Sequence, residues 1–320
     1  MDPAVTVIIP TYNWSSVLPY SIGSVLRQTF NDFELLVIGD GCTDDSEAVV
    51  GRIRDPRVKW INLPINTGHQ SEPNNEGLRR ARGQYIAYLG HDDLWLPHHL
   101  SCLVSALDEG ADLAYGMSVM LEFEGYSTWI GPPEERYQPG IWIAPTSVVH
   151  RRSVIDHVGG WRHYRELDMH HMHPDAELWL RAYTADYRFV FVPRLTAIKF
   201  PAAARRDVYK IRPCHEQAAW SERIQNEDDF EIGELIRTLF AMAAQVHAME
   251  AQVHTMAAQA RAKPPYWILL HDFVQETRKR LMRRLRRFIF GPAPSPAPPP
   301  ARWKSGIDAR REFKGLHRMP

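Results

Sequence analysis

Short apolar runs alternate with segments of helical character along the first part of the chain, and this alternation is the strongest constraint on its fold. The apolar runs are rich in β-branched residues and cover residues 5–9, 33–38, 58–62 and 84–89. Continuous apolar runs of this length are typical of strands that are buried on both faces of a parallel sheet. The sequence therefore predicts an α/β fold with a doubly wound, mostly parallel sheet.

Two adjacent acids follow the fourth apolar run. Asp92 and Asp93 stand between that run and a turn marked by Pro97. Such a pair is costly at the end of a strand unless a cation or several hydrogen-bond donors neutralise it. Mg²⁺ typically binds one or two carboxylates together with substrate phosphates, and ligands of open α/β sheets sit at the carboxyl ends of strands. The pair is a candidate anchor for a divalent cation and a diphosphate, with a solvated turn or a helix N-cap as the alternative.

A nucleotide is a ligand that such a sheet edge commonly binds. Asp40 follows the second run and could accept a hydrogen bond from a base or a ribose, or could simply belong to a turn. No G-x-G-x-x-G follows the first run and G-x-x-x-x-G-K-[ST] occurs nowhere, so dinucleotide and P-loop sites would lack their phosphate cradle. A bound nucleotide diphosphate would therefore need a divalent cation, Mg²⁺ or Mn²⁺, as cofactor.

A further acid lies at the start of a predicted helix over residues 175–181. The helix dipole favours an acid in the first turn, which alone would explain Asp175. Asp175 could also be a general base, because an inverting sugar transfer needs one carboxylate to accept the proton of the attacking hydroxyl when a metal stabilises the departing diphosphate. Farther along, Lys199, Arg205 and Arg206 are candidates for contacts to a diphosphate or an acceptor, or for a solvated surface loop.

The distribution of charge and the cysteine content indicate the cellular compartment of the chain. Residues 263–320 contain 14 Lys/Arg and 4 Asp/Glu, a net charge of +10, so residues 1–262 carry −10. The three cysteines are odd in number and widely spaced, which predicts reduced thiols in a cytosol. The first residues lead straight into a strand without a signal peptide, and no run of about 18 apolar residues occurs. We therefore expect a cytoplasmic protein.

The last third of the chain carries two helical patterns. Apolar residues recur in steps of three and four from residue 232 to residue 260, which predicts a coiled coil and hence a homo-oligomer. A helix packed against the preceding domain is the alternative. Residues 266–290 interleave apolar side chains with seven Lys/Arg, as membrane-surface helices do. Nucleic acid is the rival partner for this basic helix, and the acidic charge of the rest of the chain disfavours it.

Six segments in a fixed order resemble one known family. They are VTVIIPTYN (5–13), ELLVIGDGCTDDS (34–46), NEGLRRARG (75–83), QYIAYLGHDD (84–93), VIDHVGGW (154–161) and DAELWLR (175–181). Together they resemble the family-2 glycosyltransferases with the GT-A fold, over roughly residues 4–210. No single segment is decisive, but six in this order are highly specific.

The resemblance implies roles for individual residues. Asp175 would be the catalytic base of an inverting transfer, Asp40 would hold the base of the nucleotide, and Asp93, together with Asp92, would bind the divalent cation. The whole nucleotide-binding set that it implies comprises Pro10, Thr11, Tyr12, Asp40, Asn75 and Asp92.

Three positions depart from the family pattern. Members often carry Asp-x-Asp-Asp where this chain has Gly90-His91-Asp92-Asp93, so the first acid is missing. Members often have Ala-Arg-Asn where this chain has Pro73-Asn74-Asn75, so the Arg is absent, and Pro174 replaces the usual Glu before the base. The missing first acid and Pro174 keep open a catalytically inactive, nucleotide-sugar-binding scaffold. A nucleotidyltransferase is the enzymatic rival, but it would normally show a Gly-rich loop with Lys or Arg after the first strand.

The resulting hypothesis is a metal-dependent, inverting glycosyltransferase that moves a sugar from a nucleotide diphosphate to a hydroxyl of a glycan or lipid-linked acceptor in cell-envelope or surface glycan synthesis. The basic helix would hold this cytoplasmic enzyme at the inner face of the membrane. The sequence leaves the sugar, the base, the acceptor and the linkage open. The expected organisation is a catalytic domain (1–215) with a nucleotide-binding half (1–97) and an acceptor half (98–215), a helical or coiled-coil segment (216–262), a basic amphipathic helix (263–291), and a Pro-rich linker with a disordered tail (292–320).

Overall fold

The computed structural model describes residues 2–121, 127–130, 137–167, 173–200 and 215–259. The chain divides into two units, Met1–Pro264 and Pro265–Pro320, and the second unit lies wholly outside the described residues. The expected basic helix, the Pro-rich tail, Arg205 and Arg206 also lie outside them, so what the sequence predicts for these segments stays a prediction.

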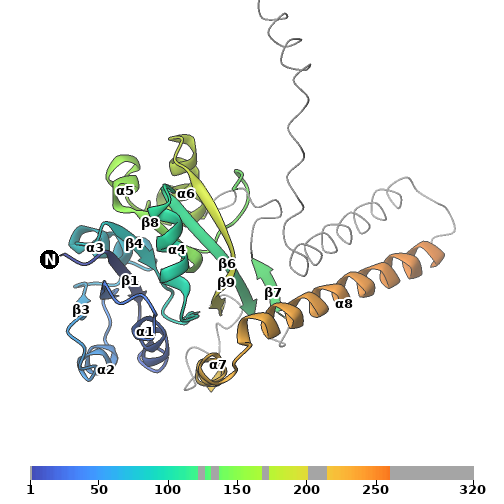
Figure 1. The fold of residues 1–320 in the computed structure, drawn as a ribbon, viewed down its shortest axis with the longest axis horizontal. Coiled ribbons are helices and arrows are strands. Elements are labelled where there is room, and N and C mark those ends of the chain that lie inside the picture. The colour runs from blue at the N-terminus through green and yellow to red at the C-terminus, as the bar shows by residue number, and fades with distance from the viewer. Residues whose placement is uncertain (1, 122–126, 131–136, 168–172, 201–214, 260–320) are drawn as a thin grey trace, which may run out of the picture. The chain divides into compact units, whose positions relative to one another are not determined.

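One nine-stranded sheet organises the first unit, in the order β3-β2-β1-β4-β8-β6-β9-β5, with β7 paired to β6 (Figure 1). Strands β1 to β4 run parallel, in register from Val5 opposite Phe33 to Thr11 opposite Gly39, whereas β8 pairs antiparallel with both β4 and β6. The first half of the sheet is thus doubly wound and parallel, as predicted, and the second half is mixed. The strands are β1 Val5–Thr11, β2 Phe33–Gly39, β3 Val58–Asn62, β4 Tyr85–Tyr88, β5 Leu94–Trp95, β6 Leu113–Leu121, β7 Ser127–Ile130, β8 Val148–Arg151 and β9 Phe189–Lys199.

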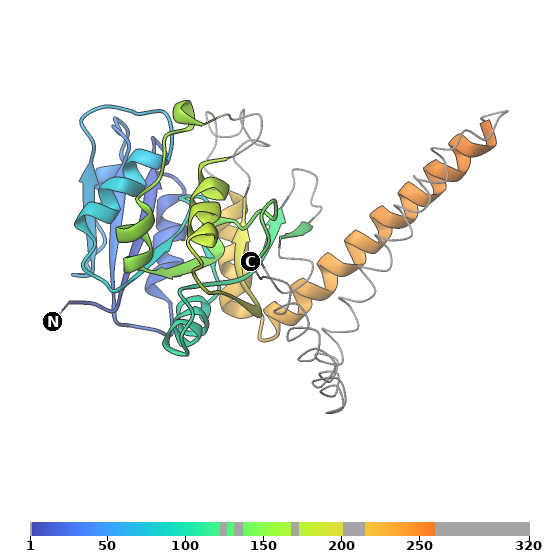
Figure 2. The same cartoon turned by 90° about the horizontal axis from the view of Figure 1, so that it is seen from above.

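Helices cover both faces of the sheet (Figures 1 and 2). The first face carries α1, α2 and α4, and the second carries α3, α5 and α6. The side chains of β1 alternate between the two layers, because Val7 belongs to the first core cluster and Ile8 to the second. This double burial explains why the strand reads as a continuous apolar run. The helices are α1 Leu18–Leu26, α2 Ser46–Gly51, α3 Ser71–Arg80, α4 His99–Asp108, α5 Arg152–Val158, α6 Pro174–Thr184, α7 His215–Asn226 and α8 Phe230–Gln259, with 3₁₀ turns η1 Pro145–Ser147 and η2 Tyr164–Glu166.

Strand β9 is longer than the sequence predicts. The apolar run 189–192 followed by Pro193 predicts a strand that ends at the proline, whereas β9 continues to Lys199. Pro193 lies where the parallel pairing with β6 is irregular, between Phe191 opposite Tyr115 and Leu195 opposite Met117. A proline is tolerated in a strand at such an irregularity, because no ladder hydrogen bond is required of it there. The same sheet also holds β7, although the polar and turn-rich sequence of residues 122–139 predicts a loop.

Helix α8 begins against the sheet domain. Phe230 and Leu235 belong to a third core cluster with residues of β6 and β9. Leu235 is part of the predicted coiled-coil seam, so for this first part of the seam the packed-helix alternative is correct. Among the described helices, none is long and apolar enough to cross a membrane.

Candidate active site

The acids singled out in the sequence lie at one edge of the sheet. Asp40 follows β2, Asp92 and Asp93 follow β4, and Asp175 lies in the first turn of α6. All four side chains are buried. Two basic side chains link these segments electrostatically. Asp93, Asp92 and Asp175 raise the pKa of Lys199, and Asp175 and Asp40 oppose the lowering of the pKa of His69. The fold thus gathers acids that are far apart in the sequence.

Asp93 is completely enclosed by hydrogen-bond donors. Its Oδ2 accepts from the hydroxyl of Thr146 in η1 and lies 3.1 Å from Nζ of Lys199. Its Oδ1 accepts from the backbone N–H of Phe200 at 3.0 Å. Both oxygens are occupied and the side chain has no exposed surface, so Asp93 is built as an anchor that joins the turn after β4 to η1 and to the end of β9.

Gly90 permits this arrangement. A Cβ at position 90 would lie 2.7 Å from Oδ2 of Asp93 and 3.2 Å from Oδ1 of Asp92. Since Thr146 and Lys199 hold that Asp93 oxygen, it has little freedom to move away. The missing first acid of the family pattern therefore has a packing reason in this chain: no side chain fits there while Asp93 points inward.

Lys199 provides a fixed positive charge among the acids. Burial alone would lower the pKa of its ammonium group, but Asp93, Asp92 and Asp175 raise the pKa overall. The side chain therefore stays protonated at neutral pH. Among the described residues, no group of three or more His, Cys, Asp or Glu side chains could hold a metal ion, so a divalent cation here would need further oxygen ligands from a substrate.

Asp175 is held at the start of α6 by two donors. Its Oδ2 accepts from Nε1 of Trp142 at 2.7 Å, and its Oδ1 accepts from the backbone N–H of Ala176 at 3.0 Å. Each oxygen of a carboxylate has about two acceptor sites, so a proton can still be accepted. Pro174 occupies the first helical position, where the missing N–H costs nothing. Its presence therefore does not disturb the helix start that presents Asp175.

Asp40 organises the loop between β3 and α3. Its Oδ1 accepts from the backbone N–H (3.0 Å) and the hydroxyl (2.8 Å) of Thr67, and its Oδ2 accepts from the N–H of Gly68 at 3.2 Å. The adjacent His69 is lowered in pKa, mainly by burial and by His163, although Asp175 and Asp40 act in the opposite direction. Asp40 thus shapes the loop that carries His69 towards Asp175, and Oδ2 keeps room for one further donor.

The end of β1 contributes the residues predicted to line a nucleotide pocket. Pro10 and Thr11 are the last buried residues of the strand, while Tyr12 just beyond it is 47% exposed. The Thr11 hydroxyl is buried without a hydrogen-bond partner among the residues that the structure describes. Beside them, Trp14 packs edge-on against His91, with 4.3 Å between ring centroids. Burial lowers the pKa of His91 to about 4, so this imidazole is neutral at physiological pH.

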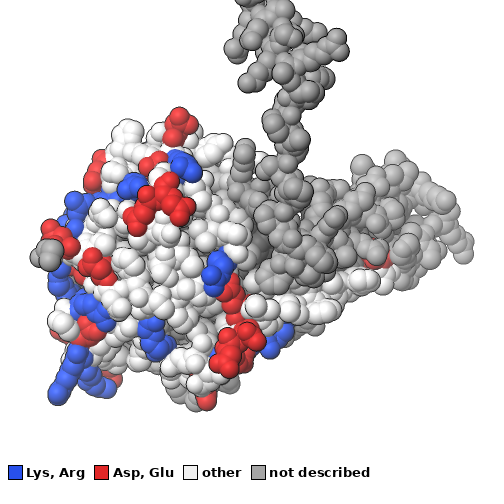
Figure 3. Space-filling model, viewed as in Figure 1, with Lys and Arg blue, Asp and Glu red and all other residues white. Residues whose placement is uncertain are grey.

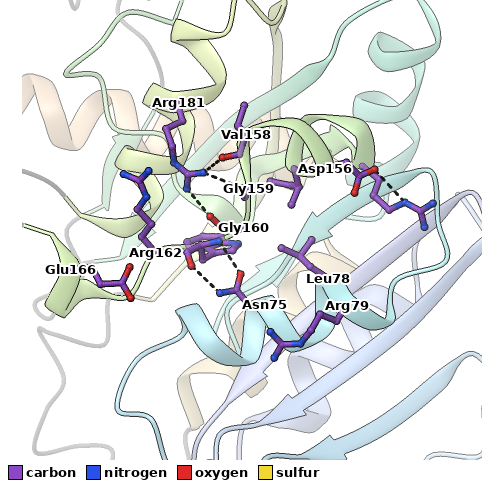
Figure 4. A pocket seen from close by; sticks show the side chains of 13 residues that line it. Asn75, Leu78, Arg79, Asp156, Val158, Gly159, Gly160, Arg162, Glu166 and Arg181 are labelled. Atoms are coloured by element: carbon purple, nitrogen blue, oxygen red, sulfur yellow. Dashed lines mark hydrogen bonds and ion pairs between the residues drawn. The ribbon is translucent and has the colours of Figure 1, made fainter.

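Asn75 serves a different part of the fold. Its amide nitrogen donates to the backbone oxygen of Trp161 and its amide oxygen accepts from the N–H of Trp161, both at 2.8 Å. It lines a cavity of about 590 Å³ between α3, α5 and α6, and none of the four site acids is among the residues lining that cavity (Figure 4). We therefore interpret Asn75 as the support of the Gly159-Gly160-Trp161 turn, and its contact with a nucleotide stays a prediction.

Arg181 connects two of the segments that resemble the family, 154–161 and 175–181. Its guanidinium donates to the carbonyl oxygens of Val158, Gly159 (3.0 Å) and Gly160 (2.6 Å), as Figure 4 shows, and to Glu177 at 2.8 Å. The helix that presents Asp175 is thereby tied to the turn that Asn75 holds from the other side. The segments 154–161 and 175–181 form one structural unit.

Sequence reasoning missed two residues of the site, Trp142 and Thr146. Both lie in an irregular stretch before β8, where no periodicity indicates which side chains point inward. Their partners, Asp175 and Asp93, are 33 and 53 residues away in the sequence. Only the tertiary fold reveals these contacts, so no local signal could have found them.

Comparison with known families gives the class of the protein. A family model described as glycosyl transferase family 2 matches residues 6–211. The chain belongs to this family, as its sequence motifs and its sheet topology indicated.

Two similar proteins carry specific names. One is the GalNAc(5)-diNAcBac-PP-undecaprenol beta-1,3-glucosyltransferase of Campylobacter jejuni, 34% identical over 128 residues, which are 38% of this chain and 40% of that protein. The other is the UDP-Glc:alpha-D-GlcNAc-diphosphoundecaprenol beta-1,3-glucosyltransferase WfgD of Escherichia coli, 34% identical over 106 residues, which are 33% of this chain and 42% of that protein. The matches thus span about two fifths of the length of these relatives.

Solved structures share the fold at low sequence identity. S. aureus TarS 1-349 in complex with UDP-GlcNAc superposes with a TM-score of 0.52 at 16% identity, covering 89% of this chain and 90% of that one. The mannosyltransferase PcManGT from Pyrobaculum calidifontis, in complex with GDP-Man and Mn²⁺, gives a TM-score of 0.51 at 17% identity, covering 92% and 89%. These likenesses establish the GT-A fold.

Proposed function

We propose that this glycosyltransferase is metal-dependent and inverting, and that it moves a sugar from a nucleotide diphosphate to a hydroxyl of a lipid-linked acceptor in envelope glycan synthesis. One observation carries the proposal: Nζ of Lys199 lies 3.1 Å from Oδ2 of Asp93 at the edge of the sheet, where Asp92 and Asp175 also raise the pKa of Lys199. The two named relatives support the acceptor class, since their names specify undecaprenol-diphosphate-linked sugars.

Asp175 acts as the general base in this proposal. The acceptor hydroxyl oxygen attacks the anomeric carbon of the donor, the bond from that carbon to the diphosphate oxygen breaks, and the hydroxyl proton passes to Asp175. The hydrogen bond from Trp142 orients the carboxylate towards the acceptor. A single displacement inverts the configuration at the anomeric carbon, so no second acid and no covalent intermediate is needed.

The diphosphate meets positive charge at the other side of the site. Lys199 faces it with a protonated amine, and Asp92 is the better candidate ligand for a divalent cation, because Asp93 is enclosed by three donors. Carboxylate oxygens suit Mg²⁺ or Mn²⁺ when substrate phosphates complete the coordination. When bound, such a cation neutralises the charge that develops on the leaving diphosphate.

The nucleotide occupies the ends of β1 and β2 in this arrangement. The buried Thr11 hydroxyl offers a donor and an acceptor, the exposed ring of Tyr12 offers a stacking surface, and Asp40 can accept one further hydrogen bond from a base. The inactive-scaffold alternative rested on Gly90 and Pro174. Both residues have packing explanations that leave Asp92 and Asp175 in place, which favours the enzyme.

A transfer assay tests the proposal. The full chain is incubated with UDP-, GDP- and dTDP-sugars, Mn²⁺, and a polyprenyl-diphosphate-linked sugar, and the product is analysed for its anomeric configuration. We expect one donor to be used with inversion, and Asp175→Asn to lower the turnover by about 10²- to 10⁴-fold while binding of the donor nucleotide is kept. Transfer with retention, or full activity of Asp175→Asn, would contradict the assigned base.

A further inference from the structure

Helix α8 changes character along its length. In its first turns Leu235 is 6% exposed and packs with the third core cluster, together with residues of β6 and β9. Beyond this contact the helix runs away from the sheet domain, as its orange half shows in Figures 1 and 2. There Phe240 is 73% and Met249 is 41% exposed. Phe240 and Met249 are therefore exposed apolar side chains of the distal half, residues 239–259.

The distal half repeats in sevens. The segment AQVHAME at residues 244–250 is followed by AQVHTMA at residues 251–257. Larger apolar residues recur in alternating steps of three and four, at Leu239, Met242, Val246, Met249, Val253 and Met256. Such spacing places them in one stripe along the helix, which is the pattern that two supercoiled helices bury between them. Met249 is the stripe residue that the structure describes as exposed, and a helix with such a stripe gains stability by burying it against a partner.

The residues flanking the stripe favour an identical partner. Gln245, Gln252 and Gln259 occupy the position on one side, and Ala243, Glu250 and Ala257 occupy the position on the other. In a parallel pair each glutamine faces an alanine or the glutamate of the second copy, so no like charges are opposed. Val246 and Val253 occupy alternate positions of the stripe and are the β-branched choice that favours two parallel strands.

The charge pattern disfavours a lipid surface. Residues 239–259 contain no Lys or Arg, and Glu250 is their single charged residue. Helices that lie on membranes usually carry Lys and Arg on their polar face, which attract anionic lipids. The flank of α8 that is visible in Figure 3 is likewise largely uncharged.

We propose that residues 239–259 of α8 pair in parallel with the same segment of a second copy of this chain. The paired helices bury Met242, Val246, Met249, Val253 and Met256 between them. Since each α8 is attached to its own sheet domain at the third core cluster, the pair holds two catalytic domains together. This inference concerns assembly and does not depend on the proposed chemistry.

Sedimentation of the full chain tests the pairing. The wild type is expected to sediment at about twice the chain mass of 36.9 kDa. Met249→Glu places a charge in the stripe and is expected to shift the protein to the monomer. Ala244→Glu places the same charge on the outer side of the helix, where the residue is exposed, and is expected to leave the dimer intact. Circular dichroism of both variants checks that the catalytic domain is folded.

A cysteine variant tests the parallel register. Val253→Cys is expected to form an intermolecular disulfide on oxidation, because identical stripe positions meet in a parallel pair. Ala244→Cys controls for the native cysteines and should not cross-link. A monomeric wild type, an equal effect of Met249→Glu and Ala244→Glu, or no cross-link from Val253→Cys would overturn the proposal. A monomer that binds anionic vesicles through Met249 would overturn it in favour of a lipid surface.

Discussion

Asp93 is the most constrained residue of the site. Three donors from two parts of the chain hold its carboxylate, and one of them is the ammonium group of Lys199. An ion pair of this kind is costly to break, because removing one partner leaves the other charge buried without compensation. We interpret Asp93 as the residue that fixes Lys199, and Asp92 as the candidate ligand of the divalent cation in the proposed function.

This interpretation predicts a large loss of stability for Asp93→Ala. The free energy of unfolding should fall by about 3 kcal/mol, because Lys199 would lose its partner while remaining largely buried. A double-mutant cycle with Lys199→Met, followed by chemical denaturation, measures the coupling. The double variant should be less destabilised than the sum of the single variants. Additive effects would contradict a paired role.

The hydrogen bond from Trp142 to Asp175 predicts an effect on kcat that is separate from the affinity for the donor nucleotide. The indole N–H of Trp142 orients Asp175, so Trp142→Phe should lower kcat by about tenfold to a hundredfold, as misplaced catalytic groups do. The affinity for the donor nucleotide should be unchanged, because Trp142 is not part of the proposed nucleotide pocket. Steady-state kinetics and nucleotide titration measure the two quantities. Trp60→Phe, in β3, is the matched control, and a rise in KM without a fall in kcat for Trp142→Phe would refute the positioning role.

At the scale of elements, the sequence predicts the parallel half of the sheet well and the mixed half poorly. Strands β1, β2 and β4 are buried on both faces, so their apolar runs are visible without any knowledge of their neighbours. Strand β9 continues past Pro193 because pairing with β6 is irregular at that point, which no local pattern reveals. The acids were predictable because adjacent or helix-initial carboxylates stand out, whereas the donors that hold them are defined by tertiary contacts.

Glu34 links several elements of the parallel half of the sheet, and its contacts predict how the stability of the folded state depends on pH. Its buried carboxylate accepts from Thr6 in β1 at 2.9 Å and from the guanidinium of Arg82, before β4, at 2.9 and 2.8 Å, and it pairs with Lys59 in β3 at 3.1 Å. Burial alone would raise the pKa of Glu34, but these donors, Arg82 foremost, lower it overall. Its ionised form therefore stabilises the folded state.

The sign of the pH dependence follows from this lowered pKa. The stabilisation is fully present above the unfolded-state pKa of about 4.3 and is lost as the pH falls through the lower folded-state pKa. Glu34→Gln should therefore be less stable than the wild type at neutral pH, and the difference should shrink in acid. Denaturation of both proteins across this range measures the difference, and a gap that stays constant would contradict the linkage.

On the scale of the whole molecule, the charges of the two parts are opposite. Residues 1–262 carry a net charge of −10 and residues 263–320 carry +10. On the face seen in Figure 3, acidic and basic side chains of the described residues are interspersed rather than separated into two fields. Binding at the sheet edge is therefore expected to depend on the local set of Lys199, Asp92 and Asp93 and only weakly on the net charge of the domain.

The donor site is the central claim, and calorimetric titration of UDP, GDP and dTDP tests it most directly. Each nucleotide is titrated with Mn²⁺ and with EDTA into the wild type and Asp92→Asn, a variant that leaves the Asp93–Lys199 pair intact. The exposed acid of α5 supplies the matched control, Asp156→Asn. We predict that one nucleotide binds, that its affinity falls without metal and in Asp92→Asn, and that Asp156→Asn binds as the wild type does. Failure of every nucleotide to bind, or binding that ignores both the metal and Asp92, would contradict the account.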